Sequence, residues 1–151
     1  MSATSINAYY KYIDYSIKSN NSLPNNMRDG FSCDILPEIS ILDYIKRLFD
    51  NILIHYENIE GVVLHSIAIL NLLQNDTIYL TEYNCYRLIL LSLMLASKIY
   101  EDIPQFNLSW AIRGGVTLED LNIMEFHIVN ILNFDFNISP QKLLAIHKCI
   151  Y

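Results

Sequence analysis

The chain has few charged residues and few residues that break helices. Of its 151 residues 17% are charged, and glycine and proline occur four times each. Its ten lysines and arginines are scattered, and the formal net charge is -6. Binding to a phosphate backbone requires clustered basic side chains, so nucleic acid is not an expected partner.

The sequence also lacks the signals that direct a chain to a membrane or an oxidising compartment. Cys33, Cys85 and Cys149 are far apart and form no C-x-x-C pair, so we expect free, buried thiols. The N-terminus has no basic segment followed by an apolar stretch, and Ser2 stands where N-myristoylation requires glycine. The apolar run 88–95 is much shorter than the roughly 20 residues that cross a bilayer. We expect no membrane contact and a cytoplasmic or nuclear location.

No residue pattern in the sequence is typical of a catalytic or metal site. His55, His65, His127 and His147 fall on four different predicted helices and form no H-x-x-x-H pair, so no metal is expected. Gly114-Gly115 lacks the spacing and the lysine of a phosphate-binding loop, and is read as a turn. His65, on an apolar helix, is expected to be a core histidine with one hydrogen-bond partner. The expectation is therefore a binding protein without cofactor or enzymatic activity.

Apolar residues at helical spacing are abundant, at 52% of the chain, and no strand pattern is present. The sequence predicts an all-α domain of about five core helices around a central one. A loop rich in Asn, Ser, Pro and Gly, residues 19–37, separates an N-terminal arm from the main body. The expected helices cover about 4–18, 40–55, 61–73, 83–101, 107–112, 117–133 and 139–151. The helix at 83–101 is expected to begin at Thr81-Glu82.

Three helix starts carry recognisable caps. Ser40 precedes an apolar stripe and has Asp43 three residues later, which resembles a capping box. Thr117 is followed by acidic residues that favour the positive end of the helix dipole. Ser139 is followed by Pro140, a residue suited to the first helical position.

The stretch from Tyr83 to Glu101 is the most buried helix expected. From Leu88 to Leu95 only Ser92 is polar, and a helix apolar on nearly all sides belongs inside a bundle. Two interpretations remain open from the residues alone. The stretch is a plain core helix, or its last turn, Ser97 to Glu101, emerges at a working surface.

Several short motifs follow one another in an order that resembles a known family. They are Tyr86-Arg87-Leu88, Ala96-Ser97-Lys98 with Glu101, A-I-R-G-G-V-T at 111–117, Leu121-Asn122 with Glu125, and Phe134-Asp135-Phe136. Their order and spacing resemble the cyclin box, and in detail the P-type (phosphate-pathway) cyclins of fungi and protists. The resemblance implies a five-helix cyclin box at 38–138, an N-terminal helix and loop at 1–37 and a C-terminal helix at 139–151.

The resemblance implies a non-catalytic subunit that binds and activates a cyclin-dependent Ser/Thr protein kinase. Lys98 and Glu125 match the lysine and glutamate with which cyclins hydrogen-bond the kinase beside its C helix. Further kinase contacts are implied at Leu95, Ile99, Glu101, Val129 and Phe134. Without the resemblance, Lys98 and Glu125 are also compatible with solvated surface charges in a weak salt bridge. Which kinase is bound, and whether cell-cycle or nutrient signals act on it, stays open.

Two departures from the family stand out. Arg47 matches a structural arginine of the first box helix, but Asn71 replaces its usual aspartate partner. A substrate-docking patch of some cell-cycle cyclins is not preserved, because Lys46 and Asp50 stand where that patch has Met and Leu. The 151 residues also hold no second cyclin repeat, as in P-type cyclins, so either the natural protein is short or this sequence stops before the repeat.

Other classes of protein remain as alternatives. One is a cyclin-fold scaffold without a kinase partner, such as a transcription-factor-IIB-like or retinoblastoma-like module. The acidic net charge speaks against the first of these, which would need a basic face. A small helical enzyme is the remaining alternative, and the lack of clustered His, Cys or acidic residues argues against it.

Overall fold

The computed structural model describes residues 2–23, 29–76 and 78–151, and in these residues the chain is all-α, as predicted. Residues 24–28 of the predicted loop lie outside the described residues. The helices are α1 Ser2–Ser19, α2 Ile41–Asn51, α3 Ile59–Asn75, α4 Cys85–Tyr100, α5 Asn107–Gly114, α6 Leu118–Ile131 and α7 Pro140–Ile150, with a 3₁₀ helix at Leu53–His55.

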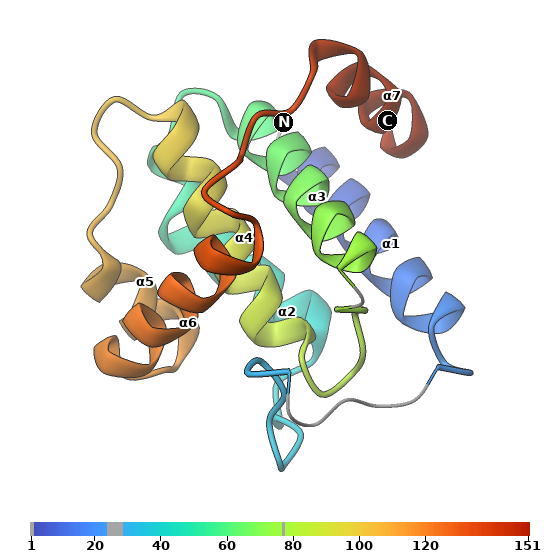
Figure 1. The fold of residues 1–151 in the computed structure, drawn as a ribbon. Coiled ribbons are helices and arrows are strands. Elements are labelled where there is room, and N and C mark those ends of the chain that lie inside the picture. The colour runs from blue at the N-terminus through green and yellow to red at the C-terminus, as the bar shows by residue number, and fades with distance from the viewer. Residues whose placement is uncertain (1, 24–28, 77) are drawn as a thin grey trace.

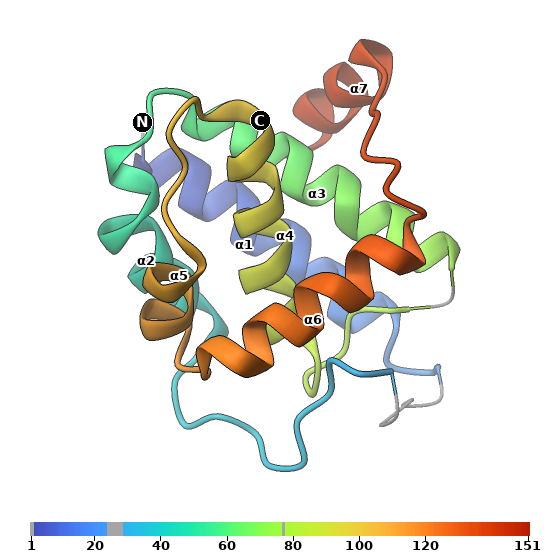
Figure 2. The same cartoon turned by 60° about the vertical axis from the view of Figure 1, so that its left-hand side comes forward.

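Helix α4 is the centre of the bundle, as the apolar run indicates. Every residue from Leu88 to Ser97 is buried. Helices α2, α3, α5 and α6 all pack against α4, and Figures 1 and 2 show it enclosed by them. Because α4 has no polar face to turn to water, it requires neighbours on every side.

Helix α1 is part of this core. Tyr9 and Ile13 are fully buried where α1 packs on α2 and α3. The Tyr9 hydroxyl lies 2.7 Å from Ser66 Oγ and 3.3 Å from Ser92 Oγ, which joins α1 to α3 and α4. Burial raises the pKa of Tyr9 far above its ordinary value, so the hydroxyl stays protonated. The division of the chain at residue 38 stays a prediction.

Helix α7 lies on the outside of the bundle, across α3 and the start of α1 (Figure 1). It has no buried residue, and Ile146 and Ile150 are its partly buried contacts with the core. His147 Nε2 lies 2.8 Å from Glu60 Oε1 of α3. The helix therefore covers the core without contributing a fully buried side chain.

The three predicted N-caps are confirmed. The side chains of Ser40, Thr117 and Ser139 each accept a hydrogen bond from the backbone N–H three residues later, at 3.1, 3.0 and 3.2 Å. Each bond satisfies a donor that the first helical turn leaves without a partner. The residue types at these positions were therefore sufficient to locate three helix starts.

The predicted start of the central helix at Thr81-Glu82 was wrong. The Asn84 side chain accepts from the backbone N–H of Thr81 at 2.8 Å and donates to the Tyr79 carbonyl at 2.7 Å. It also donates to Asp29 Oδ2 at 3.0 Å. These bonds hold residues 79–84 outside the helix, and α4 begins at Cys85.

The ends of α2 and α5 also differ from the prediction. Helix α2 ends at Asn51, and the 3₁₀ helix follows where a continuous helix to His55 was expected. Helix α5 continues through Gly114, and Gly115 ends it with a φ of 71°. A Cβ at Gly114 would collide with the Leu90 side chain, so this glycine allows α5 to approach α4 closely.

The expectation of buried thiols is correct only for Cys85. Cys33 is partly exposed and Cys149 is exposed on α7, and all three cysteines are free. Within the described parts of the chain, no group of three or more His, Cys, Asp or Glu side chains is arranged to hold a metal. None of the helices described is long and apolar enough to cross a membrane.

Candidate functional site

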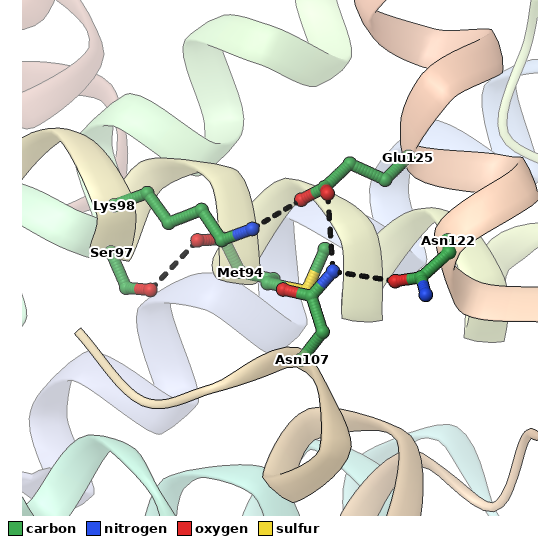
Figure 3. A network of polar contacts seen from close by, with 6 residues as sticks. All are labelled: Met94, Ser97, Lys98, Asn107, Asn122 and Glu125. Carbon is green, nitrogen blue, oxygen red and sulfur yellow. Dashed lines mark hydrogen bonds and ion pairs between the residues drawn. The ribbon is translucent and has the colours of Figure 1, made fainter. Parts of the chain in front are cut away.

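The end of α4 and the middle of α6 meet through an ion pair. Lys98 Nζ lies 2.5 Å from Glu125 Oε2, although the two residues are 27 positions apart in the chain. Their side chains are 33% and 22% exposed, so the pair lies at the surface but is partly shielded. The structure thus brings together the two residues that the resemblance singled out, as Figure 3 shows.

A third helix fixes the carboxylate of this pair. Asn107, the first residue of α5, donates from Nδ2 to Glu125 Oε1 at 3.1 Å and to Asn122 Oδ1 at 2.8 Å. Both oxygens of Glu125 are therefore bound, one by an amide and one by an ammonium group (Figure 3). Because partners on two other helices hold it, the carboxylate is oriented before any ligand arrives.

The other predicted apolar contact residues differ in how far they are exposed. Leu95, one turn before Lys98, is 7% exposed, whereas Ile99 is 46% exposed. Val129, one turn after Glu125 on α6, is partly buried. Phe134, beyond the end of α6, is 68% exposed. Leu95 therefore belongs mainly to the core, while Ile99 and Phe134 present apolar area to solvent.

Glu101, the last predicted contact residue, points in part toward α3. Its Oε1 accepts a hydrogen bond from the backbone N–H of Asn58, the N-cap of α3, at 3.4 Å. The side chain is partly buried. Glu101 thus joins the end of α4 to the start of α3, and one carboxylate oxygen is left for another partner.

The surface contains further exposed apolar residues that the sequence reading missed. Ile103 and Phe106, between α4 and α5, are 88% and 84% exposed. They border a surface hollow beside Lys98. Ile123 and Phe126 on α6 are also exposed, and they lie off the buried stripe of that helix. Apolar residues outside the buried stripe were the signal available, and such patches mark interaction sites.

The structure gives Arg47 and Asn71 different partners. The Arg47 guanidinium lies 5.3 Å from the centre of the Tyr44 ring, and the Tyr44 hydroxyl donates to the Gly114 carbonyl at 3.1 Å. Asn71 Oδ1 accepts from the Tyr12 hydroxyl of α1 at 2.5 Å. Where cyclins pair these two positions, this chain uses Asn71 to bind α1.

The turn after α6 is backed by a buried histidine. Asn133 and Phe134 have φ values of 53° and 57°, a region that costs an L-residue roughly 1–2 kcal/mol. Two residues further on, the Phe136 carbonyl lies 3.2 Å from His65 Nε2. His65 is 5% exposed and its Nδ1 has no hydrogen-bond partner, so the prediction of a core histidine with one partner is confirmed.

Comparison with known proteins decides the family. The family model for cyclins matches residues 4–136. The chain belongs to the cyclin family. Cyclin-U3-1 of Arabidopsis thaliana is 33% identical over 115 residues, which are 75% of this chain and 49% of that protein. Cyclin-P3-1 of Oryza sativa is 28% identical over 134 residues, 84% of this chain and 54% of that protein.

A yeast cyclin is among the similar proteins. PHO85 cyclin-1 of Saccharomyces cerevisiae is 34% identical over 61 residues, 39% of this chain and 22% of that protein. The chain spans about half the length of the first curated relatives it matches. The predicted resemblance to cyclins of the P type is confirmed by these matches. Cyclins are non-catalytic regulatory proteins, and this chain is accordingly not an enzyme.

Proposed function

We propose that this chain binds and activates a cyclin-dependent Ser/Thr protein kinase through the surface around Lys98 and Glu125. The observation that carries the proposal is the Lys98–Glu125–Asn107 network in a cyclin fold. It joins α4, α5 and α6 at a surface bordered by exposed apolar side chains. The amide of Asn107, from a third helix, orients the Glu125 carboxylate more firmly than an ion pair between two solvated side chains would.

The proposed mechanism is positional. Lys98 and Glu125 hydrogen-bond the kinase beside its C helix, while Ile99 and Phe134 contact that helix through apolar surface. A C helix held inward keeps its glutamate paired with the kinase strand lysine that binds ATP phosphates, which is a condition for phosphoryl transfer. The cyclin contributes no reacting group.

The energetics of such a complex follow from the surface. A stable interface buries about 1,200–2,000 Å² in total. Lys98 and Glu125 are already partly shielded, and a docked kinase would desolvate them further. Removing one member of a charged pair buried in an interface costs about 2–5 kcal/mol of affinity, because its partner stays desolvated.

A PHO85-type kinase is the first partner to test. The reason is that one relative bears the name PHO85 cyclin-1. The matched segment of that relative is short, so other cyclin-dependent kinases belong in the same experiment. The partner that gives the largest stimulation by the wild-type chain is then used for the variants.

The test compares two ion pairs on different helices of the protein. The variant Lys98→Ala with Glu125→Ala is expected to lose co-purification with the kinase and stimulation of its peptide phosphorylation. The control variant, Lys18→Ala with Asp14→Ala, removes an exposed ion pair of 2.7 Å on α1 and is expected to leave both unchanged. If both double variants bind and stimulate the kinase as well as the wild-type chain does, the assigned surface is wrong. A wild-type chain that neither binds nor stimulates any kinase would favour the scaffold alternative.

A further inference from the structure

The turn after α6 exposes an aromatic side chain from a strained backbone. Phe134 has a φ of 57° and is 68% exposed. Asparagine tolerates left-handed backbone, as at Asn133, whereas a bulky aromatic residue rarely adopts it. Such strain persists only where the surrounding structure holds it, and it concentrates at functional surfaces. Backbone hydrogen bonds close this turn, among them one of 2.9 Å from the Phe134 N–H to the Val129 carbonyl. A side chain that binds the residues just beyond the turn is placed to influence how Phe134 is presented.

His65 reaches the turn from the inside of the bundle. Its Nε2 lies 3.2 Å from the Phe136 carbonyl oxygen, and because a carbonyl only accepts, Nε2 carries the proton that is donated. Burial lowers the pKa of His65, which keeps the ring neutral, and Nδ1 is left as an acceptor. No described residue donates to Nδ1.

The same ring also contacts the end of α4. The His65 and Tyr100 rings meet edge to face, with centroids 5.4 Å apart and an interplanar angle of 75°. Tyr100 directly follows Ile99 and is two residues from Lys98. One buried ring on α3 thus contacts both chain segments that border the proposed kinase surface.

We propose that His65 is a positioning residue that holds the Phe134 turn against the end of α4 in the conformation that meets the kinase. This rests on the proposed function. A residue selected only for packing would carry no nitrogen, because a buried acceptor without a partner destabilises the fold. The hydrogen bond to Phe136 is what the imidazole adds over a leucine of similar volume.

Two substitutions separate positioning from packing. His65→Leu removes both the donor to the Phe136 carbonyl and the unpaired acceptor Nδ1, so we expect the loss and the gain in the free energy of unfolding to offset each other in large part. Amide hydrogen exchange at residues 134–137 should become faster, and affinity for the kinase that binds wild type should fall, each by about five-fold for one lost hydrogen bond. His65→Gln retains an amide donor, and we expect wild-type exchange and affinity.

Each arm can overturn the proposal. Unchanged exchange and affinity in His65→Leu would do so, and so would equal losses in the leucine and glutamine variants. Hydrogen exchange is measured without a kinase. If the wild-type chain binds no kinase, the proposed function is refuted, and the exchange rates of residues 134–137 still test whether His65 holds the turn. Nitrogen NMR of the wild-type ring is expected to show the neutral form protonated at Nε2. A ring protonated at Nδ1, or charged at neutral pH, overturns the proposal even if the leucine variant does not fold.

Discussion

The first and last helices of the chain are both amphipathic, but they stand in different relations to the core. Helix α1 buries Tyr9 and Ile13 completely, whereas α7 has no buried residue. The cyclin family match begins at residue 4 and ends at residue 136, so it includes α1 and excludes α7. Similar patterns thus produce one helix that belongs to the core and one that covers it.

The difference arises from what each helix meets. Helix α1 packs on α2 and α3, and its Tyr9 hydroxyl reaches Ser66 and Ser92 in the interior. Helix α7 meets the outer side of α3 and the start of α1 through Ile146 and Ile150. An amphipathic pattern identifies the face that is buried, and the depth of burial depends on the neighbouring elements. Three predictions test this comparison, beginning with the largest expected effect.

The labelling rates of two cysteines, Cys149 on the outer helix α7 and Cys85 in the interior, should show the largest difference. Cys149 is exposed on α7, while burial raises the pKa of Cys85 to about 12. At equal access this shift alone reduces the reactive thiolate of Cys85 about 1,000-fold relative to an ordinary thiol. We expect iodoacetamide to modify Cys149 in the native protein and Cys85 only on unfolding, as read by peptide mass spectrometry. Native labelling of Cys85 at a comparable rate would show that the interior opens.

Truncating one isoleucine in each helix compares their contributions to stability directly. Ile13→Ala in α1 removes a fully buried side chain, which should cost about 2–5 kcal/mol of the free energy of unfolding. Ile146→Ala in α7 is the matched control, and its partly buried side chain should cost clearly less. Urea unfolding measures both values. Equal losses would mean that α7 is as much a part of the core as α1.

Removing one hydroxyl from α1 and one from Tyr151, which directly follows α7, is the finest comparison. Tyr9→Phe loses the buried hydrogen bonds to Ser66 and Ser92, for a cost of about 1 kcal/mol. Tyr151→Phe loses a hydrogen bond of 2.9 Å to Ser5, but Tyr151 is 44% exposed and water replaces that partner. We expect the second change to leave the thermal midpoint almost unaltered. A larger drop in the thermal midpoint for Tyr151→Phe than for Tyr9→Phe would contradict the conclusion that α1 contributes more to the core than α7.

Local features of the fold were predictable because they depend on neighbours in the sequence. Ser40, Thr117 and Ser139 were identified as caps, since capping involves an N–H only three residues away. The central helix was identified because a segment apolar on all sides has no stable position at the surface. His65 was correctly expected in the core for the same reason.

Features that depend on distant residues escaped the sequence reading. The start of α4 was misplaced because Asn84 binds Asp29 from a loop 55 positions earlier. Cys149 was expected to be buried, but it is exposed on α7, because the packing of this helix on α3 and α1 leaves that residue at the surface. The exposure of Phe106 and Phe126 was missed as well, because it depends on which side chains the neighbouring elements leave uncovered.

In the candidate site, too, some features were predictable from the sequence and others were not. Lys98 and Glu125 were named through family resemblance, and the two charges alone favoured solvated surface charges in at most a weak salt bridge. The role of Asn107 was not foreseen, because its bonds to Asn122 and Glu125 span 15 and 18 positions. That role is visible only when α5 lies beside α6.

The sequence by itself determined the helices, their caps and the choice of α4 as the central element, because these follow from periodicity and contacts within a few residues. The tertiary structure decided that Lys98 meets Glu125, that His65 supports the turn at Phe134, and that α1 rather than α7 completes the core. Such pairings join segments tens of residues apart. Their partners are selected by how whole helices pack, which no local pattern specifies.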